Sequence, residues 1–244
     1  MDSGFYAACA GLRAQSQALE VAAHNLANVN TVGFRGEQTT FQSLVALAAP
    51  ATLNPLNRAT NNFGVFEGTH LDLGAGNLTN TGNPLDVAIE GNGFFAIQTE
   101  RGTRYTRNGS FQVSSTGELV TAAGDAVLGD NGVVRIPAGA VAVSPDGTVS
   151  VSGAVAGRLR LVRFPPGTKL LSEGATLLSA PAGSEQPAQQ FSLRQATLES
   201  SNVNAINSMA TLIGVQREAE MMGRALTLFD TEFNRIAASE LGKV

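Results

Sequence analysis

Apolar and small residues recur at alternating spacings of three and four along the last stretch of the chain, from Ala205 to Ile236. Written in heptads, this stretch fills positions a and d for more than four repeats, and Ser208 is the one polar residue among them. A strict seven-residue repeat favours a left-handed supercoil against a second helix. No proline interrupts the stretch, and Asn204 before it is a suitable N-cap. The residues expected at the interface are Leu212, Val215, Ala219, Met222, Leu226, Phe229, Phe233 and Ile236.

The N-terminal stretch carries the same repeat and offers a partner for that helix. Large apolar residues stand seven apart, and small residues such as Ala8 and Ala22 follow three positions after them, which allows two helices to approach closely. The large residues are Phe5, Leu12, Leu19 and Leu26. The pattern therefore predicts that the two chain ends form one coiled-coil pair and that the rest of the chain is inserted between them.

The middle of the chain has a different pattern, of short strand-like runs separated by glycine turns. Across residues 85–180, runs such as Phe94–Thr99 alternate with turn signals such as Asn108-Gly109 and Asp146-Gly147. Many short strands with such turns favour a small sandwich or an irregular barrel. We therefore expect an α+β fold, with long N- and C-terminal helices in a coiled-coil pair and a central β-rich domain of short antiparallel strands.

The same patterns divide the chain into four segments. Residues 36–80 show no repeating pattern and are interpreted as a linker with two short ordered pieces. The expected segments are 1–35 for the N-terminal helix, 36–80 for the linker, 81–185 for the β-rich domain, and 186–244 for a return linker and the C-terminal helix.

Composition and charge remove several classes of partner. The net charge is −4 and no basic cluster is present, which argues against a nucleic-acid partner. No apolar run approaches the ~20 residues of a membrane-spanning helix, so no membrane insertion is expected. Cys9 is the only cysteine, so the chain has no internal disulfide, and its position indicates a small packing residue. Asp2 and the absence of a basic opening segment argue against a cleaved signal peptide.

Residues that often carry chemistry are present but do not form a recognisable site. His24 and His70 have no cysteine partners, and Asp72 beside His70 is not a metal-ligand set by itself. The run Gly91-Asn92-Gly93 is too short for a phosphate loop and lies between strand-like runs rather than before a helix. We therefore predict no catalytic residue, no cofactor, no metal and no small-molecule substrate, and we do not expect an enzyme.

Three short motifs resemble one family of proteins. The N-terminal motif is N-L-A-N-V-N-T-V-G-F-R at residues 25–35, the central one is N-P-L-D-V-A-I-E-G-N-G-F-F at residues 83–95, and the C-terminal one is L-E-S-S-N-V-N at residues 198–204. Together they resemble, in this order, the motifs of the bacterial flagellar rod and hook family of axial proteins. Within the N-terminal motif, the residues that carry the resemblance are Asn25, Leu26, Ala27, Asn28, Thr31, Gly33 and Phe34.

That resemblance implies a function and a location. It implies a structural subunit of the flagellar basal-body rod, which polymerises helically through its terminal helices with copies of itself and other rod proteins and transmits motor torque. It also implies passage through the flagellar type III export apparatus without signal cleavage, and an arm formed by residues 36–80. The opening residues and the stretch Gly33–Leu44 look most like the proximal rod member of the family.

Two alternatives stay open. The distal rod member of the same family is one, and the other, from a different class, is a binding module in which a β domain stands on a coiled-coil stalk. A binding module would expose an aromatic-lined groove, and most of the few aromatic residues in the β region alternate as core residues.

The rod interpretation also makes a prediction for the isolated chain. A two-helix pair would bury only one narrow stripe of each helix and would leave Ala7, Ala14, Ala18 and Val21 without cover. Because most helical stability comes from tertiary packing, we expect the ends to be loosely ordered until neighbouring subunits cover them.

Overall fold

The computed structural model describes residues 2–43 and 64–241, and the chain forms two compact units. The helical unit comprises Met1–Leu26, Glu37–Thr69 and Asn204–Val244, and the β unit comprises Ala27–Gly36 and His70–Val203. The chain therefore crosses between the units several times. The four-segment division stays a prediction.

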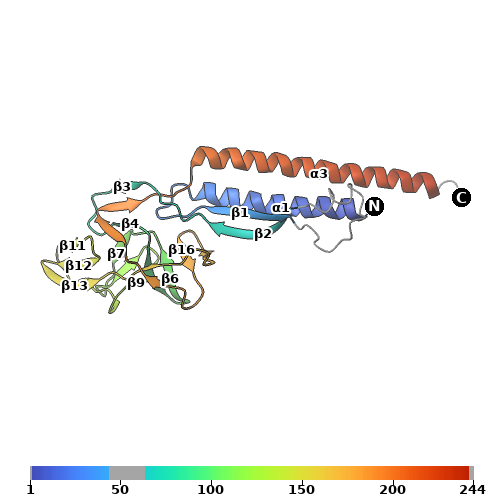
Figure 1. Cartoon of the computed structure of the whole chain (residues 1–244). Coiled ribbons are helices and arrows are strands. Elements are labelled where there is room, and N and C mark those ends of the chain that lie inside the picture. Colours follow the sequence, from blue (N-terminus) through green and yellow to red (C-terminus); the bar gives the residue numbers. More distant parts are fainter. Residues whose placement is uncertain (1, 44–63, 242–244) are drawn as a thin grey trace. The chain divides into compact units, whose positions relative to one another are not determined.

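Within the described residues, the helical unit contains two helices and a small sheet (Figure 1). Helix α1 spans Asp2–Ala27 and helix α3 spans Ala205–Leu241. Strands β1 (Glu37–Ser43) and β2 (Gly64–Leu71) form the two-stranded sheet. Asn204 caps α3 as expected, because its side-chain oxygen accepts a hydrogen bond from the Asn207 backbone N–H at 3.0 Å.

The predicted coiled-coil pair is wrong. The structure has one N-terminal helix of 26 residues and one C-terminal helix of 37 residues beside a central β-rich region. The deeply buried side chains of α1 are Ala14, Ala18 and Ala22, spaced four apart, whereas the predicted seam residues Leu12 and Leu19 are only half-buried. A coiled coil would insert those leucines as knobs between side chains of the partner helix. A stripe spaced by fours is instead a ridge of ordinary helix packing.

The burial of these alanines also corrects the prediction that they would lie without cover. Ala14 and Ala18 are 7% exposed and Val21 is half-buried within the chain itself. The two helices do touch each other. The Gln15 Nε2 donates a hydrogen bond to Glu218 at 2.9 Å, and a side chain at Gly11 would contact the end of Met222.

The β unit is built mainly from one ten-stranded sheet. Its main path runs β15-β16-β6-β5-β9-β8-β7, with β10 beside β9, β14 beside β5 and β17 beside β14. The strands are β5 (Phe94–Thr99), β6 (Gly102–Thr106), β7 (Phe111–Val113), β8 (Leu119–Thr121), β9 (Ala126–Gly129), β10 (Gly132–Val133), β14 (Leu161–Arg163), β15 (Leu171–Glu173), β16 (Leu177–Ser179) and β17 (Gln186–Pro187).

Three smaller sheets complete the β unit, and all of their pairings are antiparallel. One joins β11 (Val141–Val143), β12 (Thr148–Val151) and β13 (Ala154–Arg158). A second pairs β4 (Val87–Gly91) with β18 (Phe191–Gln195), and the third pairs β3 (Leu78–Asn80) with β19 (Thr197–Glu199). Strands from residues 78–91 therefore pair with strands from residues 191–199, far away in sequence.

Strand β5 separates two hydrophobic cores. Successive side chains of a strand point to opposite faces, so Phe95 and Ile97 enter the larger core while Phe94 and Ala96 enter the smaller one. In the larger core the rings of Phe95 and Phe111 meet edge to face, with centroids 5.1 Å apart. This double burial explains why the run F-F-A-I is apolar without alternation.

Tyr105 in the smaller core makes the stability of the fold depend on pH in the alkaline range. Its hydroxyl donates to the Glu185 carboxylate, which also accepts from Arg160 Nη2 at 2.7 Å. Burial, followed by the bond to Glu185, raises the pKa of Tyr105 from 10.0 to about 12. The folded chain resists deprotonation, so this contribution is complete below pH 10 and is lost as the pH rises through about 12.

We expect Tyr105→Phe to remove that pH dependence. The difference in free energy of unfolding between the wild-type chain and Tyr105→Phe should shrink between pH 10 and 12, measured by denaturant titration. Tyr6→Phe, the same change at the other tyrosine, is the control. A difference that stays constant over this range would show that the hydroxyl does not titrate as described.

Candidate functional site

The N-terminal motif ends α1 and turns the chain into the β unit. Thr31 donates from its backbone N–H to the Asn28 carbonyl at 3.0 Å and from its hydroxyl to the Asn28 side chain at 3.1 Å. Gly33 then adopts a φ of +70°, and Phe34 is buried. The motif residues therefore form a capped turn with a left-handed residue at its end.

Asn25, at the start of the motif, ties α1 to β1 inside the helical unit. Its amide nitrogen donates to the Glu37 carbonyl at 2.7 Å, and its amide oxygen accepts from the Glu37 N–H at 2.8 Å. This pair of hydrogen bonds from one amide group to the Glu37 backbone resembles the pairing of a neighbouring strand. His24 lies in the same place, with its Nδ1 3.7 Å from the Glu37 carboxylate.

Glu199 of the C-terminal motif is the point where distant segments of the β unit meet. One carboxylate oxygen accepts from Arg35 Nη2 at 2.6 Å and from the Gly76 N–H at 2.9 Å, and the other from Arg107 Nη1 at 3.3 Å. The Glu199 backbone carbonyl accepts from the Gly33 N–H at 2.7 Å. Arg107 also donates to the carbonyl of Ile89 and, at 2.7 Å, to that of Gly91. The N-terminal motif therefore contacts the Glu199 side chain directly through Arg35, and the central motif is linked to it through Arg107.

The charges of this cluster are almost completely withdrawn from water. Glu199 is 1% exposed and both arginines are 4% exposed. Burial, partly offset by Glu199, lowers the pKa of Arg107 to about 10, which leaves it charged at neutral pH. Nε and Nη1 of Arg35 and Nε of Arg107 have no hydrogen-bond partner among the described residues. Among the described residues, Glu199 is thus the one carboxylate that pairs with these two buried guanidinium groups, and its loss would be costly.

Asn202, three residues after Glu199, forms side-chain hydrogen bonds with the backbone of two further segments. Its amide oxygen accepts from the Gly36 N–H at 2.8 Å, and its amide nitrogen donates to the carbonyls of Asp72 and Gly74 at 2.9 and 3.1 Å. The Asp72 N–H in turn donates to the Gly36 carbonyl at 2.8 Å. The C-terminal motif therefore binds the end of the first segment of the β unit and the start of its second segment.

The central motif closes its own loop before β4. Asp86 accepts from the Thr81 hydroxyl at 2.6 Å and from the Asn83 amide at 2.9 Å. Strand β4 follows, with Val87, Ala88 and Ile89 buried. The central motif thus has a structural role, because its loop fixes the position at which β4 enters the hydrophobic core.

The predicted interface residues lie on one face of α3. Leu212, Val215, Ala219, Met222 and Leu226 are all half-buried. On α1, Leu12, Leu19 and Leu26 are half-buried as well. The side chains of Phe5, Phe229, Phe233 and Ile236 fall outside the described part of the two helices. Their role as an assembly interface stays a prediction.

A second apolar face of α3 escaped the sequence reasoning. It consists of exposed side chains spaced three, four, eight and seven apart, which places them on one side of a helix, away from the half-buried face. We call it the outer face, and its members are Ile206, Met209, Ile213, Met221 and Leu228. A heptad template accounts for only one apolar face of a helix, and these residues stand outside its a and d positions.

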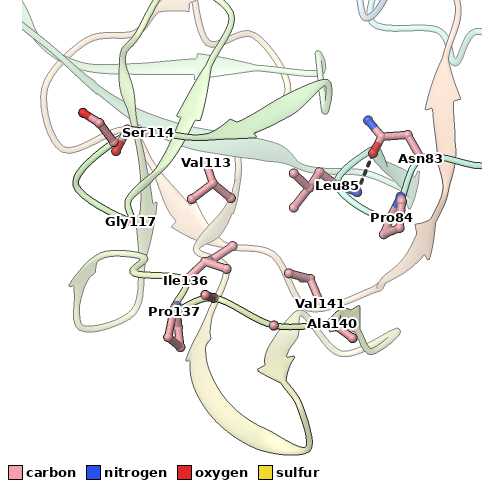
Figure 2. Close-up of a pocket in the computed structure, with 13 residues that line it drawn as sticks. Asn83, Pro84, Leu85, Val113, Ser114, Gly117, Ile136, Pro137, Ala140 and Val141 are labelled. Carbon is pink, nitrogen blue, oxygen red and sulfur yellow. Dashed lines mark hydrogen bonds between the residues drawn. The ribbon is translucent and has the colours of Figure 1, made fainter.

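A groove of about 550 Å³ opens on the β unit (Figure 2). The side chains of Leu85, Val113, Ile136 and Val141 point into the shared space. None of the thirteen residues that line this groove is aromatic or charged. The aromatic residues Phe94, Phe95, Tyr105 and Phe111 are buried in the cores instead. The groove therefore lacks the aromatic lining expected of the alternative binding module.

The comparisons with known proteins agree with the motif geometry. Residues 5–35 match the family described as flagella basal body rod protein, and residues 88–151 match the D1 domain of the flagellar hook proteins FlgE/F/G. The flagellar basal-body rod protein FlgF of Caulobacter vibrioides is 33% identical over 248 residues, which cover 100% of each chain. The chain belongs to the flagellar basal-body rod protein family.

Other relatives of this rod protein lead to the same family. FlgG of Bacillus subtilis is 33% identical over 92% of this chain and 94% of its own, and FlgF of Escherichia coli is 34% identical over 96% and 97%. The relatives named FlgF confirm the expected resemblance to the flagellar rod family, and in particular to its FlgF type. Family membership makes this chain a structural subunit of the flagellar basal body, where it assembles with other basal-body components. No helix in the described residues is long and apolar enough to cross a membrane.

Proposed function

We propose that this rod subunit assembles through its terminal helices with copies of itself and with other rod proteins, and that the outer face of α3 makes the contact. Its role is mechanical rather than enzymatic, since it passes motor torque from one subunit to the next. The observation that carries the proposal is the second apolar face of a helix whose other face is already partly covered within the chain.

The physical argument rests on the exposure of these side chains. Ile206 is 78% exposed and Ile213 is 50% exposed, and the other members of the outer face are also large, apolar and at least half exposed. Covering such side chains in an assembly removes apolar surface from water, which stabilises the assembly by about 25 cal/mol for each Å² buried. A chain that contacts a neighbour through different surfaces on the two partners forms an open helical filament when the rotation between subunits does not close into a ring.

A pair of adjacent residues tests which face makes the contact. Ile213→Asp places a charge on the outer face and should abolish polymerisation and swimming, while the monomer keeps its helix content and thermal midpoint. Leu212→Asp places the same charge on the half-buried face and should lower the thermal midpoint of the monomer. Sedimentation of the purified chain, circular dichroism and swimming assays give the readouts.

Thr211→Asp is the matched control, because Thr211 is exposed on α3 but does not belong to the outer face. It should leave polymerisation unchanged. If Ile213→Asp polymerises like Thr211→Asp, the outer face makes no assembly contact and the proposal fails.

The finer assignments follow the family resemblance. We place the subunit in the proximal part of the rod, because chains named FlgF are among its relatives over their full length. FlgG relatives are equally similar, so the distal rod position is the competing assignment. Cross-linking of the subunit in isolated basal bodies, followed by identification of its neighbours, separates the two. Passage through the flagellar export apparatus belongs to the same proposal.

A further inference from the structure

The two ends of the chain enter the β unit through segments that are bonded directly to each other. Residues 33–36 follow α1, and residues 199–202 precede α3. The Gly33 N–H donates to the Glu199 carbonyl at 2.7 Å, and the Gly36 N–H donates to the Asn202 side chain at 2.8 Å. Between them, Arg35 and Glu199 form the buried ion pair at 2.6 Å. These partners are 164 and 166 residues apart in the sequence.

The direction of these bonds decides how they bear a load. Gly33 pairs with Glu199 and Gly36 pairs with Asn202, so both segments run the same way. A pull on the N-terminal end reaches the paired stretch at Gly33, and a pull on the C-terminal end reaches it at Asn202. Those are opposite ends of the stretch, so the bonds are sheared together rather than opened one at a time.

We propose that residues 33–36 and 199–202 form a mechanical latch. The latch carries a load applied between the chain ends and keeps that load off the strands enclosed between Glu37 and Leu198. Glu199 anchors it to the core through Arg107, and Asn202 anchors it to the backbone at Asp72 and Gly74. The latch acts in the isolated chain and does not depend on the outer face of α3.

Single-molecule pulling of the full chain tests the latch. One handle is attached to Cys9, which is exposed, and the other to a Thr231→Cys substitution on the exposed side of α3. The wild-type chain should give one force peak, which releases the enclosed strands. Asn202→Ala should abolish that peak, so that the strands lengthen in steps at lower force.

A second pulling direction separates the latch from general destabilisation. With handles on Cys9 and on a Val155→Cys substitution, the load crosses the strands, and Asn202→Ala should unfold at the wild-type force. Asn83→Ala is the matched control, since that amide is also hydrogen-bonded but lies outside the latch. It should leave the end-to-end peak unchanged. The latch is refuted if Asn202→Ala lowers the force equally in both directions or changes neither.

Discussion

Glu199→Ala should destabilise the β unit by about 3–5 kcal/mol, the usual cost of breaking a buried ion pair by removing one partner. The substitution leaves Arg35 and Arg107 buried without a counter-charge and removes the acceptor of the Gly76 N–H. Domains of this size are stable by only about 5–15 kcal/mol, so the loss is a large share of the total. The denaturant midpoint of the purified chain gives the measurement.

Glu90→Ala is the control for this change. Glu90 also pairs with an arginine, through two bonds from Arg194 at 2.9 and 3.1 Å, but both side chains are more than half exposed. An exposed pair of this kind is worth about 0–1 kcal/mol. Equal losses of unfolding free energy from Glu199→Ala and Glu90→Ala would mean that burial does not determine how much the Glu199 cluster stabilises the fold.

Local features of the fold could be predicted from the sequence, because they depend on neighbouring residues. The N-cap at Asn204 depends on Asn207 and the following helix, and the turn that leads into Gly33 is closed by hydrogen bonds between Asn28 and Thr31. The family could also be predicted, because its three motifs stand in order along the chain. Their shared centre could not be predicted, since Arg107 lies 92 residues from Glu199 and outside every motif. A lone charged residue in a sequence is normally assigned to the surface.

The error in the helical unit has a different cause. The heptad pattern assumed that each terminal helix has one partner along one seam. In the structure α1 buries the small residues Ala14, Ala18 and Ala22, and α3 has apolar side chains on two faces. The half-buried face of α3 satisfies a heptad template by itself even when no coiled coil is formed, because residues three and four apart are neighbours on any helix face. The outer-face residues stand outside the a and d positions of that template. The period of a pattern thus predicts the helix but not the number of its partners.

Gly33→Ala should be the most damaging glycine substitution in the motifs, with a loss of about 2–5 kcal/mol. A left-handed conformation at φ +70° costs a residue with a Cβ about 1–2 kcal/mol. The new Cβ would also lie 2.3 Å from the backbone nitrogen of Asn108 and 2.5 Å from the carbonyl carbon of Arg107. Overpacking of this kind costs about 1–3 kcal/mol. The necessary shift would move Arg107 away from Glu199, so the two terms act on the same cluster.

Gly82→Ala separates the two terms. Gly82 has a nearly identical φ of +75°, but no atom lies within 4 Å of the position its Cβ would take. It should therefore lose only the conformational term, about 1–2 kcal/mol. The difference in free energy of unfolding between the two variants, from denaturant titrations in one buffer, isolates the steric contact with Arg107 and Asn108. If the two variants are equally stable, the backbone relaxes freely at Gly33, and the tight turn at the end of the N-terminal motif does not hold the Glu199 cluster in place.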